Sequence, residues 1–122
     1  MTFRYARHTT DLHKIKHFYV DLLGLEVLGS FENHTNYDGI FIGKKGSDWH
    51  LEFTVSDVKP EHTPDKDDLL VFYLDTEKEY NAIIIFLKSN GIKGVEAINP
   101  YWNANGFTIV DPDGFRVVLA LK

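Results

Sequence analysis

The chain has 122 residues, of which 43% are hydrophobic, and carries a formal net charge of −5 with no cysteine. Its length and apolar content suit one domain over residues 1–122, or two very small halves that share a core. The lack of cysteine excludes disulfides, thiolate metal ligands and a cysteine nucleophile. The acidic balance argues against a nucleic-acid partner. Because the sequence has neither a secretory pattern nor a membrane-length apolar run, we expect a cytoplasmic protein that does not bind membranes.

The first half of the chain is predicted to contain a strand, a helix and three more strands. Alternating residues predict a strand over Phe3–His8, and Thr9, Thr10 and Asp11 then offer N-cap side chains. The helix that follows should end at Gly24, where a left-handed residue is common. Its apolar stripe consists of Leu12, Ile15, Phe18, Tyr19, Leu22 and Leu23. Further strands are predicted over Leu25–Gly29, Gly39–Gly43 and Trp49–Thr54, with polar turns over Asn33–Asp38 and Lys44–Asp48.

A change of composition separates this half from the next. Residues from about 56 to 68 include Pro60 and Pro64 among charged side chains and have no apolar periodicity. We interpret them as a surface connection between one module of about residues 1–55 and a second of about 69–122.

The second half repeats the order of the first. Thr76 and Glu79 form a capping box at the start of a helix, which should end at Gly91. Strands are predicted over Leu69–Leu74, Val95–Ile98, Phe107–Val110 and Arg116–Leu121, with a loop over Asn99–Gly106 and a turn over Asp111–Gly114.

Each module therefore has the order βαβββ, and one such unit cannot bury both its helix and its sheet face alone. We predict an α+β fold in which two tandem modules form one curved mixed sheet of eight strands, with helices outside and a ligand cup inside. Period-two alternation gives the cup face these residues: Arg4, His8, His50, Glu52, Thr54, Leu69, Tyr73, Arg116, Val118 and Ala120. It gives the helix side these: Phe3, Tyr5, Leu51, Phe53, Leu70, Phe72, Val117, Leu119 and Leu121.

Three motifs resemble the vicinal oxygen chelate superfamily, which includes glyoxalase I, bleomycin-resistance proteins, fosfomycin-resistance enzymes and extradiol dioxygenases. They are Phe18-Tyr19 with Leu22-Leu23-Gly24-Leu25, then His50-Leu51-Glu52-Phe53, and Asp111-Pro112-Asp113-Gly114-Phe115. The segment Asn99–Gly106 resembles a glyoxalase-like bacterial branch. The resemblance spans the whole chain and implies the paired βαβββ fold and a homodimer whose cups receive residues from both subunits.

Enzymes of this superfamily hold a divalent metal with one ligand from each of four strands, normally His, Glu, His or Gln, and Glu. By the resemblance, the four positions fall on Arg4, Glu52, Leu69 and Val118. A guanidinium cannot coordinate a cation, and the two aliphatic side chains have no donor atom, so only Glu52 matches. We therefore expect no metal at the standard site and no other cofactor.

A non-standard ligand set of His8, His50 and Glu52 stays open, and would suit a zinc, nickel or iron ion. Against it, strand-edge histidines are usually solvated. The preferred interpretation is an approach of Arg4 to Glu52, in which the guanidinium supplies positive charge without a metal. Such a pair could hold a carboxylate or vicinal-dioxygen ligand, or the two side chains could simply pair with each other and bind nothing else.

Two aromatic residues complete the candidate site. Tyr73 is either a hydrogen-bond donor or general acid in the cup, or a half-buried aromatic. Trp102 is either part of a ligand lid or dimer contact, or a plug in the core. No catalytic residue can be assigned.

The leading hypothesis is a homodimer that binds a small organic molecule without a metal, through Arg4, His8, His50, Glu52, Tyr73, Trp102 and Arg116. The alternatives are a metal-dependent glyoxalase-like lyase or dioxygenase around Glu52, and a dimeric scaffold with a filled cup.

Overall fold

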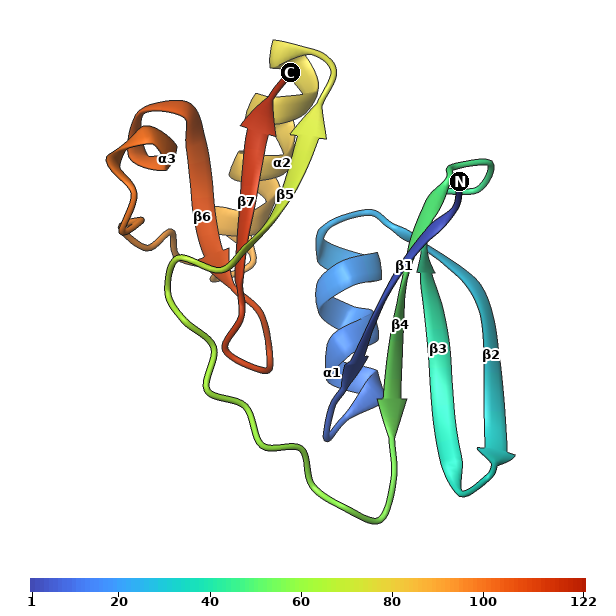
Figure 1. Ribbon diagram of the computed structural model, residues 1–122. Coiled ribbons are helices and arrows are strands. Elements are labelled where there is room, and N and C mark those ends of the chain that lie inside the picture. The colour runs from blue at the N-terminus through green and yellow to red at the C-terminus, as the bar shows by residue number, and fades with distance from the viewer. The chain divides into compact units, whose positions relative to one another are not determined.

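The computed structural model describes all residues, 1–122, and the chain divides into two compact units, Met1–Glu61 and His62–Lys122 (Figure 1). The first unit holds a four-stranded sheet in the order β1-β4-β3-β2, and the second holds a three-stranded sheet in the order β5-β7-β6. The α+β class and the two-module organisation are therefore confirmed. The strands number seven rather than eight, and they belong to two hydrogen-bonded sheets.

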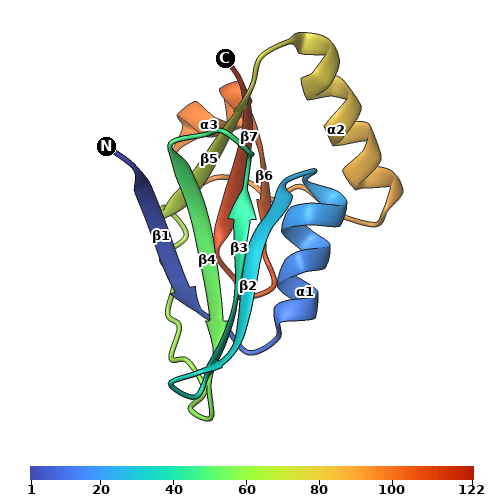
Figure 2. The ribbon, with the colours of Figure 1, turned by 90° about the vertical axis from the view of Figure 1, so that its right-hand side faces the viewer.

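The first unit follows the predicted order of elements. Its strands are β1 (Phe3–His8), β2 (Glu26–His34), β3 (Tyr37–Gly43) and β4 (Trp49–Val55). Figure 2 shows them side by side, with β1 at one edge of the sheet and β2 at the other. The strand β1 runs parallel to β4, whereas β3 is antiparallel to both of its neighbours.

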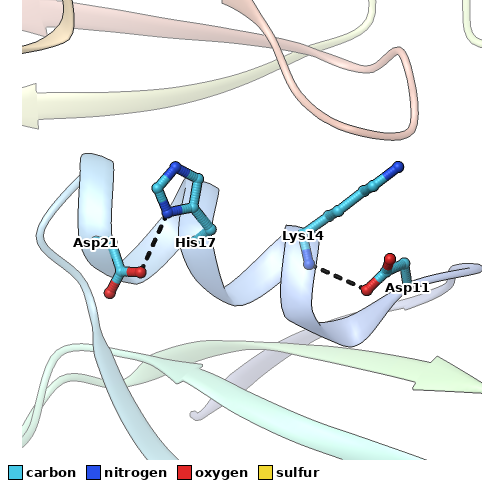
Figure 3. A network of polar contacts seen from close by, with 4 residues as sticks. All are labelled: Asp11, Lys14, His17 and Asp21. Atoms are coloured by element: carbon cyan, nitrogen blue, oxygen red, sulfur yellow. Dashed lines mark hydrogen bonds and ion pairs between the residues drawn. The ribbon is translucent and has the colours of Figure 1, made fainter. Parts of the chain in front are cut away.

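The helix of the first unit begins at the predicted cap and then widens. Asp11 Oδ1 accepts a hydrogen bond from the backbone N–H group of His13 at 2.9 Å. It accepts a second one from that of Lys14 at 3.2 Å (Figure 3). The helix α1 (Leu12–Lys16) continues as a π-helix over His17–Leu22, which no sequence pattern indicated. Asp21 lies 3.2 Å from His17 Nδ1 within this π segment (Figure 3). The segment ends, as predicted, at Gly24, whose φ of +79° suits glycine.

The core of the first unit lies between this helix and β4. The Tyr19 ring centroid is 5.1 Å from that of Phe53, and neither side chain is exposed to solvent. Leu51, two residues before Phe53 on the same face of β4, is 5% exposed. The prediction that Leu51 and Phe53 face the helix is therefore confirmed, and the alternate residues of β4 lie on the opposite face.

The second unit contains β5 (Leu69–Leu74), α2 (Glu77–Ser89), α3 (Pro100–Asn105), β6 (Gly106–Val110) and β7 (Arg116–Leu121). Central strand β7 pairs in parallel with β5 and antiparallel with β6. Thr76 caps α2 as predicted, since its Oγ1 accepts a hydrogen bond from the Glu79 N–H at 3.2 Å. None of the helices in either unit combines the length and the apolar character that crossing a bilayer requires.

Two predictions for residues 95–106 are wrong. The strand expected over Val95–Ile98 is a single bridge between Val95 and Thr108, and the loop expected over Asn99–Gly106 contains α3. The Asn103 side chain bonds both the N–H and the C=O of Ala97, at 2.8 and 3.1 Å, so these groups do not join a strand ladder. Asn99 Oδ1 accepts from the Tyr101 N–H at 3.0 Å, and Pro100 occupies the first helical turn, where its missing N–H costs nothing.

The turn between β6 and β7 matches its prediction. Asp111 is 4% exposed, and its Oδ1 accepts hydrogen bonds from the backbone N–H groups of Asp113 and Phe115 at 2.9 and 3.0 Å. Gly114 has a φ of +90°, which other residues rarely adopt. A single buried carboxylate thus fixes the hairpin that delivers β7 to the centre of its sheet.

Candidate functional site

The face of the first sheet opposite α1 collects the polar residues predicted for that unit. The parallel register of β1 and β4 pairs Arg4 with His50 and His8 with Thr54. In a parallel pair, partner residues project to the same face, so Arg4, His50 and Glu52 share one surface. On β3, Phe41 is the partner of Glu52 and joins this surface.

The Arg4 guanidinium is the centre of this surface. Its Nε donates a hydrogen bond of 2.9 Å to His50 Nε2, and its Cζ lies 5.2 Å from the centroid of the Phe41 ring. Its Nη1 is 3.7 Å from Glu52 Oε1, so the predicted approach of Arg4 to Glu52 is present. The Arg4 side chain is 52% exposed and the Glu52 side chain only 15%. The guanidinium thus contacts both His50 and Phe41 while about half of the Arg4 side chain stays exposed to solvent.

The contact with Arg4 occupies one ring nitrogen of His50. An arginine Nε can only donate, so His50 Nε2 is the acceptor of this hydrogen bond. The His50 ring also meets Phe41 edge-on, at 5.8 Å between centroids. The nitrogen that could bind a metal on this side of the ring is therefore occupied by a cationic donor.

Aromatic rings extend the surface beyond the guanidinium. The Phe31 ring lies 5.7 Å from that of Phe41, and it lies directly over Gly39 of β3, where any side chain would collide with it. The row of rings gives the cation an apolar border, which suits a ligand with both a charged group and a hydrocarbon or aromatic part.

His8 lies apart from this arrangement. Its Nε2 is 3.0 Å from Ser56 Oγ, and its ring is 6.0 Å from that of Tyr37. In residues 1–122 no group of three or more histidines and carboxylates is arranged to hold a metal ion, so His8, His50 and Glu52 do not form the non-standard set.

The residues at the superfamily's four ligand positions do not fit a metal either. Arg4 places a permanent positive charge 3.7 Å from the one carboxylate, Glu52, that could ligate. Leu69 has no donor atom, and Val118 is a fully buried hydrocarbon side chain. A divalent cation beside Glu52 would meet the guanidinium at short range, where like charges repel strongly.

The three ligand-binding residues predicted in the second unit, Tyr73, Trp102 and Arg116, lie in two different places. Arg116 Nη1 donates a 2.7 Å hydrogen bond to the backbone C=O of Glu96, so its guanidinium is engaged within the unit. Tyr73 and Trp102 line one pocket together with residues of α2, α3 and β7. Trp102 is half-buried and Tyr73 is 56% exposed, so neither plugs a core.

Sequence reasoning missed two residues of the first unit. Phe41 stacks on Arg4, but its place depends on the register between β3 and β4, which residue patterns do not reveal. Arg7 is 4% exposed and lies over the Tyr5 and Phe53 rings at 5.6 and 5.3 Å. Arg7 is two residues after Tyr5 on the same strand, so alternation could have placed it on the helix side of the sheet, although buried arginines are rare.

Comparison with known proteins connects this geometry to a family. Residues 3–54 match the model of the YycE-like N-terminal domain, and residues 67–120 match that of the YycE-like C-terminal domain. The YycE protein of Bacillus subtilis (strain 168) is 44% identical over 116 residues, which are 94% of this chain and 84% of that protein. A crystal structure of B. subtilis YycE, a protein of unknown function, is 43% identical, with a TM-score of 0.86 over 98% of this chain and 88% of that chain.

More distant structures share the fold. Glyoxalase I of Leishmania major is 18% identical, with a TM-score of 0.76 over 99% of this chain and 86% of that chain. TnmS3, an antibiotic binding protein from Streptomyces sp. CB03234, is 20% identical, with a TM-score of 0.72 over 99% and 94%. The two domain matches, the identity to YycE and this shared architecture together show that the chain belongs to the YycE-like family of the vicinal oxygen chelate superfamily.

Proposed function

We propose that this protein is a cytoplasmic binding protein for a small organic anion, held by the Arg4 guanidinium with no divalent metal in the binding step. The observation that supports it most is the state of Arg4, which is anchored by His50 through Nε and is nevertheless 52% exposed. Such an arginine is positioned in advance, so less side-chain entropy is lost when a ligand binds.

The chemistry of the guanidinium indicates the ligand class. The hydrogen bond from Nε and the stacking on Phe41 fix its plane, while the terminal N–H groups can donate to a carboxylate or to two vicinal oxygens. The 3.7 Å separation from Glu52 exceeds a charge-assisted hydrogen bond, so an anion can compete for those groups. The rings of Phe41 and Phe31 would contact the apolar part of the ligand.

A protein of the same fold supports binding of a small organic molecule as one use of the architecture, because TnmS3 is an antibiotic binding protein. Glyoxalase I of Leishmania major shares the fold as well, but we do not favour the alternative of a metal-dependent lyase or dioxygenase, because the donor set around Glu52 does not suit a metal. The scaffold alternative would require Arg4 to be covered, and half of its side chain is exposed within this chain.

Replacing Arg4 by alanine is expected to weaken binding of a small carboxylate about 10- to 100-fold, the effect of losing a hydrogen-bonded charge contact worth about 1.5–3 kcal/mol. Ligands that raise the thermal unfolding temperature would be selected from a library of carboxylates, and their Kd values would then be measured for each variant. Lys16→Ala is the charge-matched control, because Lys16 is an exposed residue of α1. If every selected carboxylate bound the wild type and Arg4→Ala with equal affinity, the proposal would be contradicted.

We also propose that the protein is a homodimer, as the superfamily resemblance implies. The edge strand β2 supports an interface, since Val27 and Leu28 are each 42% exposed there. Sedimentation equilibrium at micromolar protein is expected to give twice the mass of one chain. A monomer over the whole concentration range would remove this part of the proposal.

A further inference from the structure

A separate pocket lies within the second unit. It has a volume of about 360 Å³, and four aromatic side chains line it: Tyr73 of β5, Tyr80 of α2, and Tyr101 and Trp102 of α3. Small-molecule sites usually have volumes of about 300–1,000 Å³, so the pocket has room for a small ligand. None of its lining residues belongs to the surface around Arg4.

Local contacts hold the aromatic wall in place. The rings of Tyr101 and Trp102 meet at 89° with centroids 4.9 Å apart, and Asn105 Nδ2 donates a 2.9 Å hydrogen bond to the Tyr101 C=O. Gly106 lets α3 approach β7 closely, since a Cβ at this position would lie 2.6 Å from Val118 Cγ1 and 3.4 Å from the Trp102 C=O oxygen. The wall is therefore built before any ligand arrives, which favours binding.

Two of the four aromatic side chains that line the pocket are exposed to solvent. Tyr73 is 56% exposed and Tyr101 is 57% exposed, although both carry large apolar rings. Aromatic side chains offer stacking and edge-to-face contacts to another ring, and the tyrosine hydroxyl groups can bond oxygen atoms. Exposed tyrosines around a concave space are thus suited to a planar ring.

Charge decides between the two kinds of ligand that aromatic walls attract. Clustered aromatic faces would favour a cation, but Lys122 also lines this pocket. Its Nζ forms an ion pair with Asp75 Oδ1 at 3.9 Å, and because the two side chains are 74% and 77% exposed this pair is weak, so a ligand carboxylate can compete for the ammonium group. Because Lys122 and not Asp75 lines the pocket, an anionic ring is favoured over a cationic one.

We propose that this pocket binds a small aromatic carboxylate, whose ring lies against Tyr73, Tyr101 and Trp102 and whose charge faces Lys122. The inference is independent of the proposed function, because the site does not use Arg4.

The indole N–H of Trp102 provides a local signal for the test. The chain has two tryptophans, Trp49 and Trp102, so Trp49→Phe assigns the remaining indole resonance in a ¹H–¹⁵N correlation spectrum. Titration with benzoate is expected to shift this resonance saturably. Tyr101→Leu should weaken binding about tenfold by removing ring contacts, and Tyr73→Leu, on another element, should do the same. Phe86→Leu is the control, since Phe86 is 46% exposed on α2 and lies outside the pocket.

Two further probes and one variant complete the design. Cyclohexanecarboxylate has the charge of benzoate without the aromatic ring, and benzyltrimethylammonium has the ring with the opposite charge. Both are expected to bind at least tenfold more weakly than benzoate, and Arg4→Ala should leave the benzoate titration of Trp102 unchanged. Equal binding of the saturated acid, tighter binding of the cation, or no shift with benzoate would each overturn the proposal.

Discussion

Replacing Phe53 by alanine is expected to lower the free energy of unfolding by about 3–5 kcal/mol, the range for truncating a buried phenylalanine. Phe53 is 0% exposed, and its ring packs between Tyr19, at 5.1 Å between centroids, and the guanidinium of Arg7, at 5.3 Å. Alanine would leave a cavity between α1 and β4 and would remove the ring that faces the buried Arg7 charge. Urea unfolding followed by circular dichroism measures the change.

Phe3→Ala is the matched control for this substitution. Phe3 lies on β1 of the same sheet but is 64% exposed, so its truncation should change stability by no more than about 0.5 kcal/mol. Similar losses for Phe3→Ala and Phe53→Ala would show that Phe53 does not form the core of the first unit as described.

Replacing Asp111 by alanine is expected to lower the free energy of unfolding by about 2–4 kcal/mol, because the buried carboxylate accepts two hydrogen bonds from part-buried backbone N–H groups. These are the N–H groups of Asp113 and Phe115, at 2.9 and 3.0 Å. Without the acceptor, the turn that aligns β6 with β7 would leave both donors unsatisfied. Thermal and urea unfolding of the variant measure the loss.

Asp111→Asn separates the hydrogen bonds from the packing, since the amide oxygen can take the place of Oδ1. It should retain more than half of the stability that alanine loses. If asparagine and alanine were equally destabilising, the hydrogen bonds from Asp113 and Phe115 would not be what holds the turn.

The sequence predicted regular elements well wherever alternation or helical spacing was uninterrupted. The strands Phe3–His8, Leu69–Leu74 and Arg116–Leu121 have the predicted bounds. The predictions for residues 95–106 were wrong for a specific reason. There the Asn103 side chain bonds the backbone of Ala97, and such a contact between a side chain and a distant backbone leaves no periodic trace. The π-helix over His17–Leu22 likewise has apolar residues that look like an ordinary helical stripe.

The candidate site was only partly predictable for similar reasons. Strand parity was enough to place Arg4, His50 and Glu52 together, because all three belong to two predicted strands. The stacking of Phe41 on Arg4 required the register of a third strand, and the hydrogen bond from Arg116 to Glu96 required the path of an irregular segment. The sequence therefore predicted which residues could bind a ligand, but not which side chains or backbone groups from other segments contact them.

The central claim is that a guanidinium, and not a divalent metal, holds the anion in this protein. The most direct test is isothermal titration calorimetry, before and after exhaustive dialysis against EDTA, with a carboxylate that was selected by thermal shift and that Arg4→Ala binds more weakly. We predict Kd values within about twofold of each other, since Arg4 supplies the positive charge. Loss of binding after dialysis, restored by one equivalent of a divalent metal in the wild type but not in Glu52→Ala, would contradict it.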